Sequence, residues 1–585
     1  MRWRHDLVEG LGEAGVISEG VPNIPISNKS AAFSNECSGV SDGGPIAALG
    51  RFKPFDPSGS FVPTADSGEL RRLAVRGAGV SVLGQGSVLA VQMIATVLLA
   101  RLLTPGDFGL VIMVTTFSLL FVSFGVTGFA DAILQRDTID HLLVSNLFWI
   151  NVGAGLLLAV GFAAAGSLAA RFYGDPRVTR IAAALSLTIF FSSTSAQHLA
   201  LLKRAMRFSA VSANDIIARI VSLALSTFLA WRGWGYWALV IGAVALPLVL
   251  SIGAWVFCRW IPGLPRRVAG TWSMVRFAIS VYGRFSANYS ARNLDNLLVG
   301  WRFGPHGLGV YKKAYDLFAL SANQLLSPLY EVAVSALSRL KVDSDRYRQH
   351  FLAAVSILAF LGMGLGTVLT LVGRDLIFLL LGPKWETSGR IFTFFAPGIG
   401  AMLLYGAQNW IHVSIGRPDR WVRWSIIEFA VTGSLFLLAL PWGPLGIAVA
   451  WSISFWILVI PAFWYAGRPI HLGVSAVIGA AWKYVLASLL AGCATARIIR
   501  AITSYVAILP SVPALARMLM VSSVFVTLYL GAVVLLHGGW GPLYRLAGVL
   551  RDMVPWNRFP RLFSLNLANL TLSRGDQMPA PISEK

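Results

Sequence analysis

The sequence predicts an all-α polytopic membrane protein. Of its 585 residues, 56% are hydrophobic and only 13% are charged, and the mean hydropathy is +0.67. Because about 20 apolar residues cross a bilayer as a helix, each long run without charge predicts a span. Four runs contain no Asp, Glu, Lys or Arg: 142–170, 233–258, 352–373 and 518–536.

The full hydropathy pattern predicts about fourteen transmembrane helices. A fifth charge-free run, 429–467, is too long for one span, and its Pro441-Trp442-Gly443-Pro444 sequence predicts a turn that divides it. The expected spans are 77–100, 108–130, 145–169, 181–202, 213–231, 236–258, 275–300, 315–337, 351–373, 391–413, 422–440, 444–466, 475–496 and 515–537. An even number leaves both termini on one side of the membrane.

Basic residues between the spans predict which side that is. After even-numbered spans they form four clusters: Lys203, Arg204 and Arg207; Arg266 and Arg267; Arg339, Lys341, Arg346 and Arg348; Arg417, Arg420 and Arg423. Loops after odd-numbered spans hold fewer, with Arg171, Arg177, Arg180, Lys312 and Lys313 as exceptions. Since loops rich in Lys and Arg stay on the inner side, both termini are expected in the cytoplasm.

An internal repeat predicts the domain organisation. Residues 101–110 and 301–310 share a proline and a glycine at an offset of 200. Ser81–Gln85 matches Ser280–Arg284, and a Trp-Gly pair precedes the last span of each group, at 234–235 and 442–443. We therefore expect two six-helix bundles, 74–260 and 261–470, followed by two additional helices in 471–538. Transporters commonly bind their substrate between such repeats.

The two ends of the chain are expected to lie outside the bundles. Residues 1–73 are rich in Gly, Ser, Pro and Asn and show no helical period, which predicts a disordered cytoplasmic arm; a translation start assigned too far upstream explains them equally well. Residues 539–585 read as a basic cytoplasmic tail. It either lies on the anionic inner leaflet or is solvated.

The seventh span, 275–300, carries the charges most costly in a bilayer. Arg284, Asn288, Arg292 and Asp295 are spaced so that they share one helix face. A positively biased polar stripe at membrane depth predicts a binding site for an anionic substrate. The alternative is structural: the arginines snorkel, or Arg292 pairs with Asp295 at i, i+3.

Other spans carry further candidates. In the eighth span, Asn323, Gln324 and Ser327 share a face with Glu331, which either couples transport to a proton or neutralises an arginine. Arg219 in the fifth span is a candidate phosphate ligand or a snorkelling residue. Glu428 in the eleventh span also lies near the predicted cytoplasmic end, where it either snorkels or pairs with Arg423 or Arg420. Lys312, Lys313 and Asp316 lie on the outer side, where they either contact a departing substrate or are solvated.

Composition and motifs argue against enzymatic roles. Asp343-Ser344-Asp345 has the spacing of a glycosyltransferase metal motif but lies in a short loop. The eight histidines form no ligand pair, the three cysteines form no metal or disulfide pattern, and no ATP-binding loop motif is present. We expect a transporter without metal or cofactor. The net charge of +21 is spread over the loops, so nucleic acid is not an expected partner.

Three stretches carry a family resemblance: Ala100–Gly109 (ARLLTPGDFG), Lys203–Phe208 (KRAMRF) and Asn293–Tyr315, which contains NLDNLLVG and GLGVYKKAY. They resemble bacterial polysaccharide transporters, the Wzx-like lipid-linked oligosaccharide flippases of the multidrug/oligosaccharidyl-lipid/polysaccharide exporter superfamily. The resemblance covers residues 70–500 and leaves the first 70 residues outside it.

The resemblance implies a function in the bacterial inner membrane. Such proteins move a polyprenyl-pyrophosphate-linked repeat unit to the outer leaflet by alternating access, for exopolysaccharide, capsule or lipopolysaccharide biosynthesis. Glycosyltransferases and a polymerase of the same pathway are implied partners. Arginines would bind the pyrophosphate, and Asn288, Asn293, Asn296, Asn323 and Gln324 would face the sugar. The alternatives are an ion-coupled multidrug-type exporter and an integral-membrane polysaccharide polymerase or ligase.

Overall fold

The computed structural model describes residues 52–61, 67–124, 128–136, 138–266, 268, 270–341, 343–505, 513–544 and 548. They belong to one compact unit, residues 51–585. Every named element within them is a helix, and their only extended pairings are two isolated bridges. The all-α prediction is confirmed.

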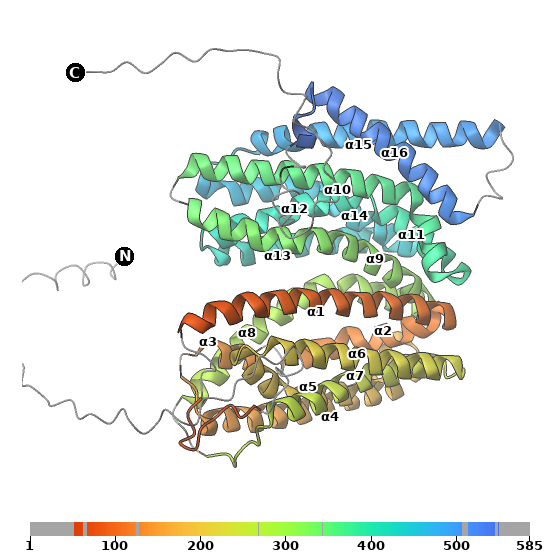
Figure 1. The fold of residues 1–585 in the computed structure, drawn as a ribbon. Helices are drawn as coiled ribbons and strands as arrows, with labels where there is room; N and C mark the ends of the chain where they lie inside the picture. The colour runs from red at the N-terminus through yellow and green to blue at the C-terminus, as the bar shows by residue number, and fades with distance from the viewer. Residues whose placement is uncertain are drawn as a thin grey trace, which may run out of the picture. The chain divides into compact units, whose positions relative to one another are not determined.

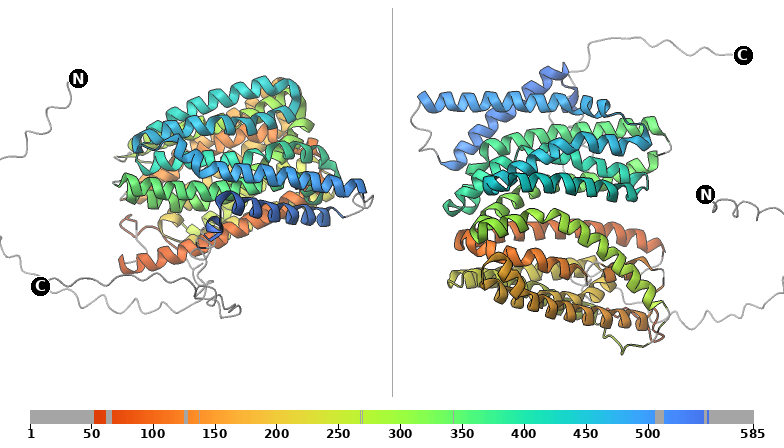
Figure 2. Two further views of the ribbon diagram at one scale, coloured as in Figure 1. Left: turned by 90° about the horizontal axis from the view of Figure 1, so that it is seen from above. Right: turned by 180° about the vertical axis from the view of Figure 1, so that it is seen from behind.

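The helices form two groups and a C-terminal pair (Figure 1). The first group is α1 (Ser67–Leu102), α2 (Pro105–Ser123), α3 (Phe129–Gln135), α4 (His141–Tyr173), α5 (Arg177–Arg204), α6 (Phe208–Trp231) and α7 (Tyr236–Cys258). The second is α8 (Thr271–Arg292), α9 (Leu294–Leu340), α10 (Ser344–Leu381), η3 (Pro383–Trp385), α11 (Glu386–Phe395), α12 (Gly398–Ser414), α13 (Pro418–Ala439), η4 (Leu440–Trp442), α14 (Gly443–Gly467) and η5 (Arg468–Ile470). The helices α15 (Val474–Tyr505) and α16 (Ala514–His537) pack on α10; Figure 2 shows this pair, in blue, on the side away from the first group.

The breaks between helices recur at offsets of 200 to 210 residues. The turn between α1 and α2 corresponds to Gly304, where α9 changes direction with φ 68° and ψ −171°. Met206 (φ 56°) and Gly416 (φ 71°) turn the chain into α6 and α13 in the same way. The residues that start and stop the helices therefore follow the repeat that the sequence predicts.

Helix α2 begins with a capping interaction close to the point where the two groups meet. The Thr104 hydroxyl accepts a hydrogen bond from the Asp107 N–H at 3.3 Å, and the Asp107 carboxylate accepts one from the Thr104 N–H at 3.0 Å. Pro105 occupies the first helical position. This reciprocal capping satisfies N–H groups that a helix start otherwise leaves unpaired.

The span count is lower than predicted when judged by length and composition alone. Within the described residues, ten helices qualify, or eleven if the 54° bent pair Pro383–Phe395 and Gly398–Ser414 is one span. Two helices that carry polar stripes, α8 and α9, do not qualify, and α13 and α14 count together as Asp419–Ile470. The total of fourteen remains a prediction.

Part of the predicted N-terminal arm is folded. Residues 52–61 pack on the first group, where Phe52 is buried and lies 5.1 Å from the Arg207 guanidinium. The Phe61 ring lies 5.3 Å from the guanidinium of Arg204. Aromatic side chains supply the apolar surface and the cation–π partners that a Gly- and Ser-rich arm lacks. The rest of the arm before Ser67, and most of the tail 539–585, lie outside the described residues.

Candidate functional site

The two groups touch at one end of the bundle, where α2 crosses α9. The crossing is symmetric: a Cβ added to Gly109 would lie 1.7 Å from the Pro305 carbonyl oxygen, and one added to Gly309 would lie 1.9 Å from the Pro105 carbonyl oxygen. Only glycine permits so close an approach of two backbones. The proline and glycine shared by the two repeats therefore form the contact between them.

Two further bonds join the groups at the same end. The Arg101 guanidinium donates to the Leu379 carbonyl at 2.7 Å, at the C-terminus of α10. The Trp385 indole N–H donates to the Ala100 carbonyl at 2.8 Å, at the C-terminus of α1. Each bond satisfies a carbonyl that the end of a helix leaves free. The clustered basic loops lie at the other end, so the positive-inside rule predicts that this end faces outward.

Helix α8 breaks the symmetry of the repeat. Its counterpart α1 packs along α6. Helix α8 packs mainly against α2, α3 and α4 of the first group, and makes a smaller contact with α13 (Figure 1). A Cβ on Gly128 would lie 2.6 Å from the Ala278 carbonyl oxygen, and the Tyr289 hydroxyl donates to the Thr116 carbonyl at 3.0 Å. The helix with the polar stripe thus belongs to the second group by sequence and contacts the first.

The structure places the candidate residues of α8 and the start of α9 in contrasting positions. Arg292 is exposed, whereas Asp295 is 0% exposed. The Tyr311 hydroxyl and the Trp451 indole N–H both donate to one Asp295 oxygen, at 2.7 and 3.1 Å. The bridge between Arg292 and Asp295 that the structural alternative allows is not formed, because two donors from elsewhere in the second group hold the carboxylate. The side chains of Arg284, Asn288 and Glu331 lie outside the described residues, so only their helices are known.

Arg292 lies beside a carboxylate without pairing with it. It is within electrostatic reach of Glu428 on α13 and of Tyr405 on α12. No acidic side chain that the structure describes lies within 4.0 Å of Arg292. An exposed guanidinium without an ion pair keeps its donors free for an anion.

The Glu428 carboxylate has a partner that the sequence did not suggest. The Tyr405 hydroxyl acts on it electrostatically, and that hydroxyl accepts a hydrogen bond from the Trp424 indole N–H at 2.7 Å. The expected partners pair elsewhere: Arg420 donates to the Tyr465 carbonyl at 2.5 Å, and Arg423 faces Asp419 at 4.0 Å. Buried Tyr and Trp usually find a polar partner, and that rule is the only signal in the sequence for these interactions.

The polar stripe on α9 is exposed over several turns. Asn323, Gln324 and Ser327 are all exposed. The stripe continues to Ser335 and Arg339, which line a hollow of about 460 Å³ with Val332 and Ala336. Polar groups on one face of a membrane helix predict contact with water or substrate rather than with lipid.

The remaining candidates lie apart from this stripe or serve local structure. Arg219 on α6 is half-buried and pairs with Asp215 at 3.1 Å, four residues earlier. Asn293 donates to the Tyr289 carbonyl at 2.9 Å and accepts from Asn296, which is buried. In the described conformation these groups are occupied by neighbours, whereas Arg292 and the α9 stripe are accessible.

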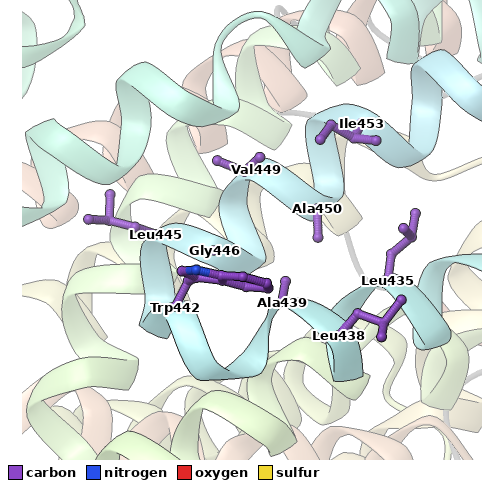
Figure 3. Close-up of a pocket in the computed structure, with 9 residues that line it drawn as sticks. All are labelled: Leu435, Leu438, Ala439, Trp442, Leu445, Gly446, Val449, Ala450 and Ile453. Carbon is purple, nitrogen blue, oxygen red and sulfur yellow. The ribbon is translucent and has the colours of Figure 1, made fainter.

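A second hollow, of about 510 Å³, lies between α13 and α14 at the turn they share (Figure 3). Only apolar side chains and glycine line it: Leu435, Leu438, Ala439, Trp442, Leu445, Gly446, Val449, Ala450 and Ile453. Its one side-chain donor is the Trp442 indole N–H, and it has no charged group for a phosphate. The polar substrate site therefore has to be sought on α8 and α9.

No cluster of three or more His, Cys, Asp or Glu side chains suited to a metal occurs among the described residues. The accessible groups are a guanidinium, amides and hydroxyls. Such groups bind an anionic and polar molecule by hydrogen bonds and charge.

Comparison with known proteins gives relatives of one kind. Residues 98–389 match the family model described as "Polysaccharide biosynthesis protein". The lipopolysaccharide biosynthesis protein WzxC of Escherichia coli (strain K12) is 24% identical over 328 residues, which cover 54% of this chain and 65% of that protein. The succinoglycan biosynthesis transport protein ExoT of Rhizobium meliloti (strain 1021) is 21% identical over 331 residues, 57% of this chain and 67% of that protein. The matched part thus spans about two thirds of these relatives.

Two solved structures share the fold. The lipid II flippase MurJ in an inward closed conformation superimposes with a TM-score of 0.63 at 13% identity, covering 81% of this chain and 99% of that one. An inward-facing multidrug resistance transporter of the MATE family gives 0.54 at 12% identity, covering 66% and 94%. Both likenesses concern the fold alone, because the sequences have diverged so far.

Proposed function

We propose that this chain, a member of the multidrug/oligosaccharidyl-lipid/polysaccharide exporter superfamily similar to its polysaccharide transporters, is a flippase of the inner membrane. It moves a polyprenyl-pyrophosphate-linked oligosaccharide to the outer leaflet for the synthesis of a surface polysaccharide. The proposal is carried by two observations: Arg292 is exposed and has no ion pair with any residue that the structure describes, and the amides of the α9 stripe are exposed as well. This arrangement suits a pyrophosphate joined to a sugar.

The mechanism follows from where the two groups meet. Their contact at the α2–α9 crossing closes the outer end, so Arg292 and the α9 stripe are reached from the inner side. The pyrophosphate binds the arginines of α8, including Arg284, and the sugar contacts Asn323 and Gln324. The polyprenyl chain stays in lipid, where it costs no desolvation. Separation of the groups at the outer end then releases the polar part.

A multidrug-type exporter is the competing function, since a MATE transporter shares the fold. A site for organic cations needs accessible carboxylates. Among the described carboxylates on these helices, Asp295 is buried, Glu428 lies near Arg292, and Asp215 and Asp316 are paired with Arg219 and Lys312. The accessible charge is Arg292, which favours an anionic substrate.

The test is translocation of a fluorescent polyprenyl-pyrophosphate disaccharide by the full-length chain in liposomes. We expect Arg292→Ala and Arg284→Ala to slow it about tenfold or more, because a charge-assisted contact to phosphate is lost. The matched control is Arg423→Ala, whose side chain is 74% exposed on α13 and faces its acid at only 4.0 Å. Translocation that is unaffected by either variant, together with export of an organic cation, would overturn the proposal.

A further inference from the structure

Two adjacent lysines at the outer end of α9 have different surroundings. Lys312 donates to Asp316 at 2.5 Å, and its side chain is 21% exposed. Lys313 is 9% exposed, and its Nζ lies 4.2 Å from the centroid of the Phe108 ring. Within the described chain, no carboxylate lies within 4.0 Å of Lys313 and no group accepts a hydrogen bond from it.

The ring that covers Lys313 belongs to the other group of helices. Phe108 lies on α2, one residue before Gly109, and packs edge-on against Trp385 at 5.4 Å. Lys313 therefore stays covered only while α2 and α9 remain in contact at their crossing. If the outer end opens, the ammonium loses its aromatic cover and faces the exit path.

A buried ammonium whose nearest partner is an aromatic ring is held at a cost, even though the Asp316 carboxylate, which pairs with Lys312, also attracts it from beyond 4.0 Å. Burial removes its hydration, and a cation–π contact returns less than a carboxylate would. Lys312, one residue earlier, already has Asp316, so it does not lack a counter-charge. Lys313 is the cation that gains most from an anion when the crossing opens.

We propose that Lys313 binds the phosphate or pyrophosphate group of the substrate once the outer end opens, and that Phe108 covers it until then. This inference rests on the proposed function, because alternating access is what separates α2 from α9. The ligand class is a phosphate anion, carried by a lipid or free in solution. Lysine binds phosphate as a compact point charge and tolerates variation in ligand geometry.

Amine labelling tests whether Phe108 shields Lys313 from solvent. The full-length chain in nanodiscs is treated with a membrane-impermeant N-hydroxysulfosuccinimide ester, and each lysine is followed by peptide mass spectrometry. We expect Lys313 to react more slowly than Lys312, the internal control. Phe108→Ala should raise the labelling rate of Lys313 about tenfold, which corresponds to the loss of a cation–π contact, and should leave the labelling rate of Lys312 nearly unchanged. Equal rates for the two lysines in the native chain would overturn the inference.

Protection by ligand tests the site. In the Phe108→Ala chain, inorganic pyrophosphate should protect Lys313, and sulfate at the same ionic strength should protect it much less. A second arm uses nanodiscs with and without polyprenyl pyrophosphate. Protection by the lipid alone assigns the site to a lipid headgroup, and protection by both assigns it to phosphates in general. Protection by neither, or equal protection by sulfate, overturns the inference.

An experiment in cells tests the same inference if the Phe108→Ala variant does not fold. Lys313→Met keeps the aliphatic stem and removes the charge, so it should lower surface polysaccharide about tenfold, the loss of one charged contact. Lys313→Arg should retain most of the output at equal protein level. Native output from Lys313→Met would overturn this inference alone, because export by the native chain shows separately that the proposed function holds.

Discussion

At the scale of single residues, Asp295 is the buried charge whose loss should matter most for stability. Two donors, from Tyr311 and Trp451, converge on one of its oxygens. Asp295→Ala leaves both unsatisfied, at about 1–3 kcal/mol each. We expect a marked fall in the apparent Tm of the purified chain, and a smaller one for Asp295→Asn, which keeps an acceptor. Asp419→Asn, at an exposed 4.0 Å pair, is the control; equal effects of Asp295→Ala and the control would contradict this account.

Asp175, in the loop between α4 and α5, predicts a pH dependence. Two Arg177 nitrogens donate to its carboxylate at 3.0 and 2.8 Å, which holds the pKa of that carboxyl below its usual value. A carboxyl with a lowered folded-state pKa stabilises the fold fully when the pH is above the unfolded-state pKa, which is about 3.9. This stabilisation is lost as the pH falls through the lowered folded-state pKa.

We expect the difference in apparent Tm between the Asp175→Asn variant and the native chain to disappear in acid. Asp175→Asn should lower the apparent Tm at pH 7 by about 1–2 °C, the size of a surface ion pair in a large chain. The difference should shrink as the pH falls below about 3.9, where the unfolded chain takes up the proton, and disappear once the pH falls through the lowered folded-state pKa and the native pair is protonated too. Arg177→Gln should follow the same profile. A deficit that stays constant down to the lowest pH would contradict the assignment.

At the scale of elements, the α2–α9 crossing depends on two glycines. Gly109→Ala or Gly309→Ala would drive a methyl group into a carbonyl oxygen of the facing helix. Relief requires the helices to separate, so we expect lower stability by about 1–3 kcal/mol and a loosened outer end. The reporter is Ser388→Cys, a fully buried position whose hydroxyl donates to the Val310 carbonyl, in a chain without the three native cysteines.

An impermeant maleimide should react with that cysteine faster in either glycine variant. The matched control is Gly153→Ala on α4, where nothing lies within 4 Å of an added Cβ. Unchanged labelling and unchanged stability in the crossing variants would show that the helices are not in contact there.

The helices and turns also show which features could be predicted from the sequence. Offsets near 200 located corresponding turns, because Pro and Gly act locally on the backbone. The span 275–300 was predicted as one helix, yet α8 ends at Arg292 and α9 restarts at Leu294. The Asn293 amide donates to the Tyr289 carbonyl at that point, a local competition with the helix that a hydropathy window does not register.

The partners of the buried charges were beyond local reasoning. Asp295 meets Trp451, 156 residues away along the chain. Lys313 meets Phe108 of the other repeat. The stripe on α9 could be predicted, because its polar residues recur within one helix. Which stripe residues are free and which are paired depends on packing between distant helices, and a single sequence does not encode that pairing in a readable pattern.

At the scale of the whole molecule, the repeat predicts the orientation of matching positions. Six predicted spans in each group bring the chain back to the same side, so equivalent turns should face one side of the membrane. The turns at Met206 and Gly416 should both be cytoplasmic, next to the basic clusters. The turns that carry Trp234 and Trp442, which are 54% and 72% exposed, should both face outward. An inverted repeat would place the members of each pair on opposite sides.

Single cysteines distinguish the two arrangements in intact cells. We expect Lys203→Cys and Arg417→Cys to resist an impermeant maleimide until the membrane is permeabilised. Trp234→Cys and Trp442→Cys should react at once, because both sit in exposed turns at the other end. The pairs control each other, since each compares equivalent positions of the two groups. A split within either pair would contradict the parallel repeat and, with it, the assignment of the α2–α9 crossing to the outer end.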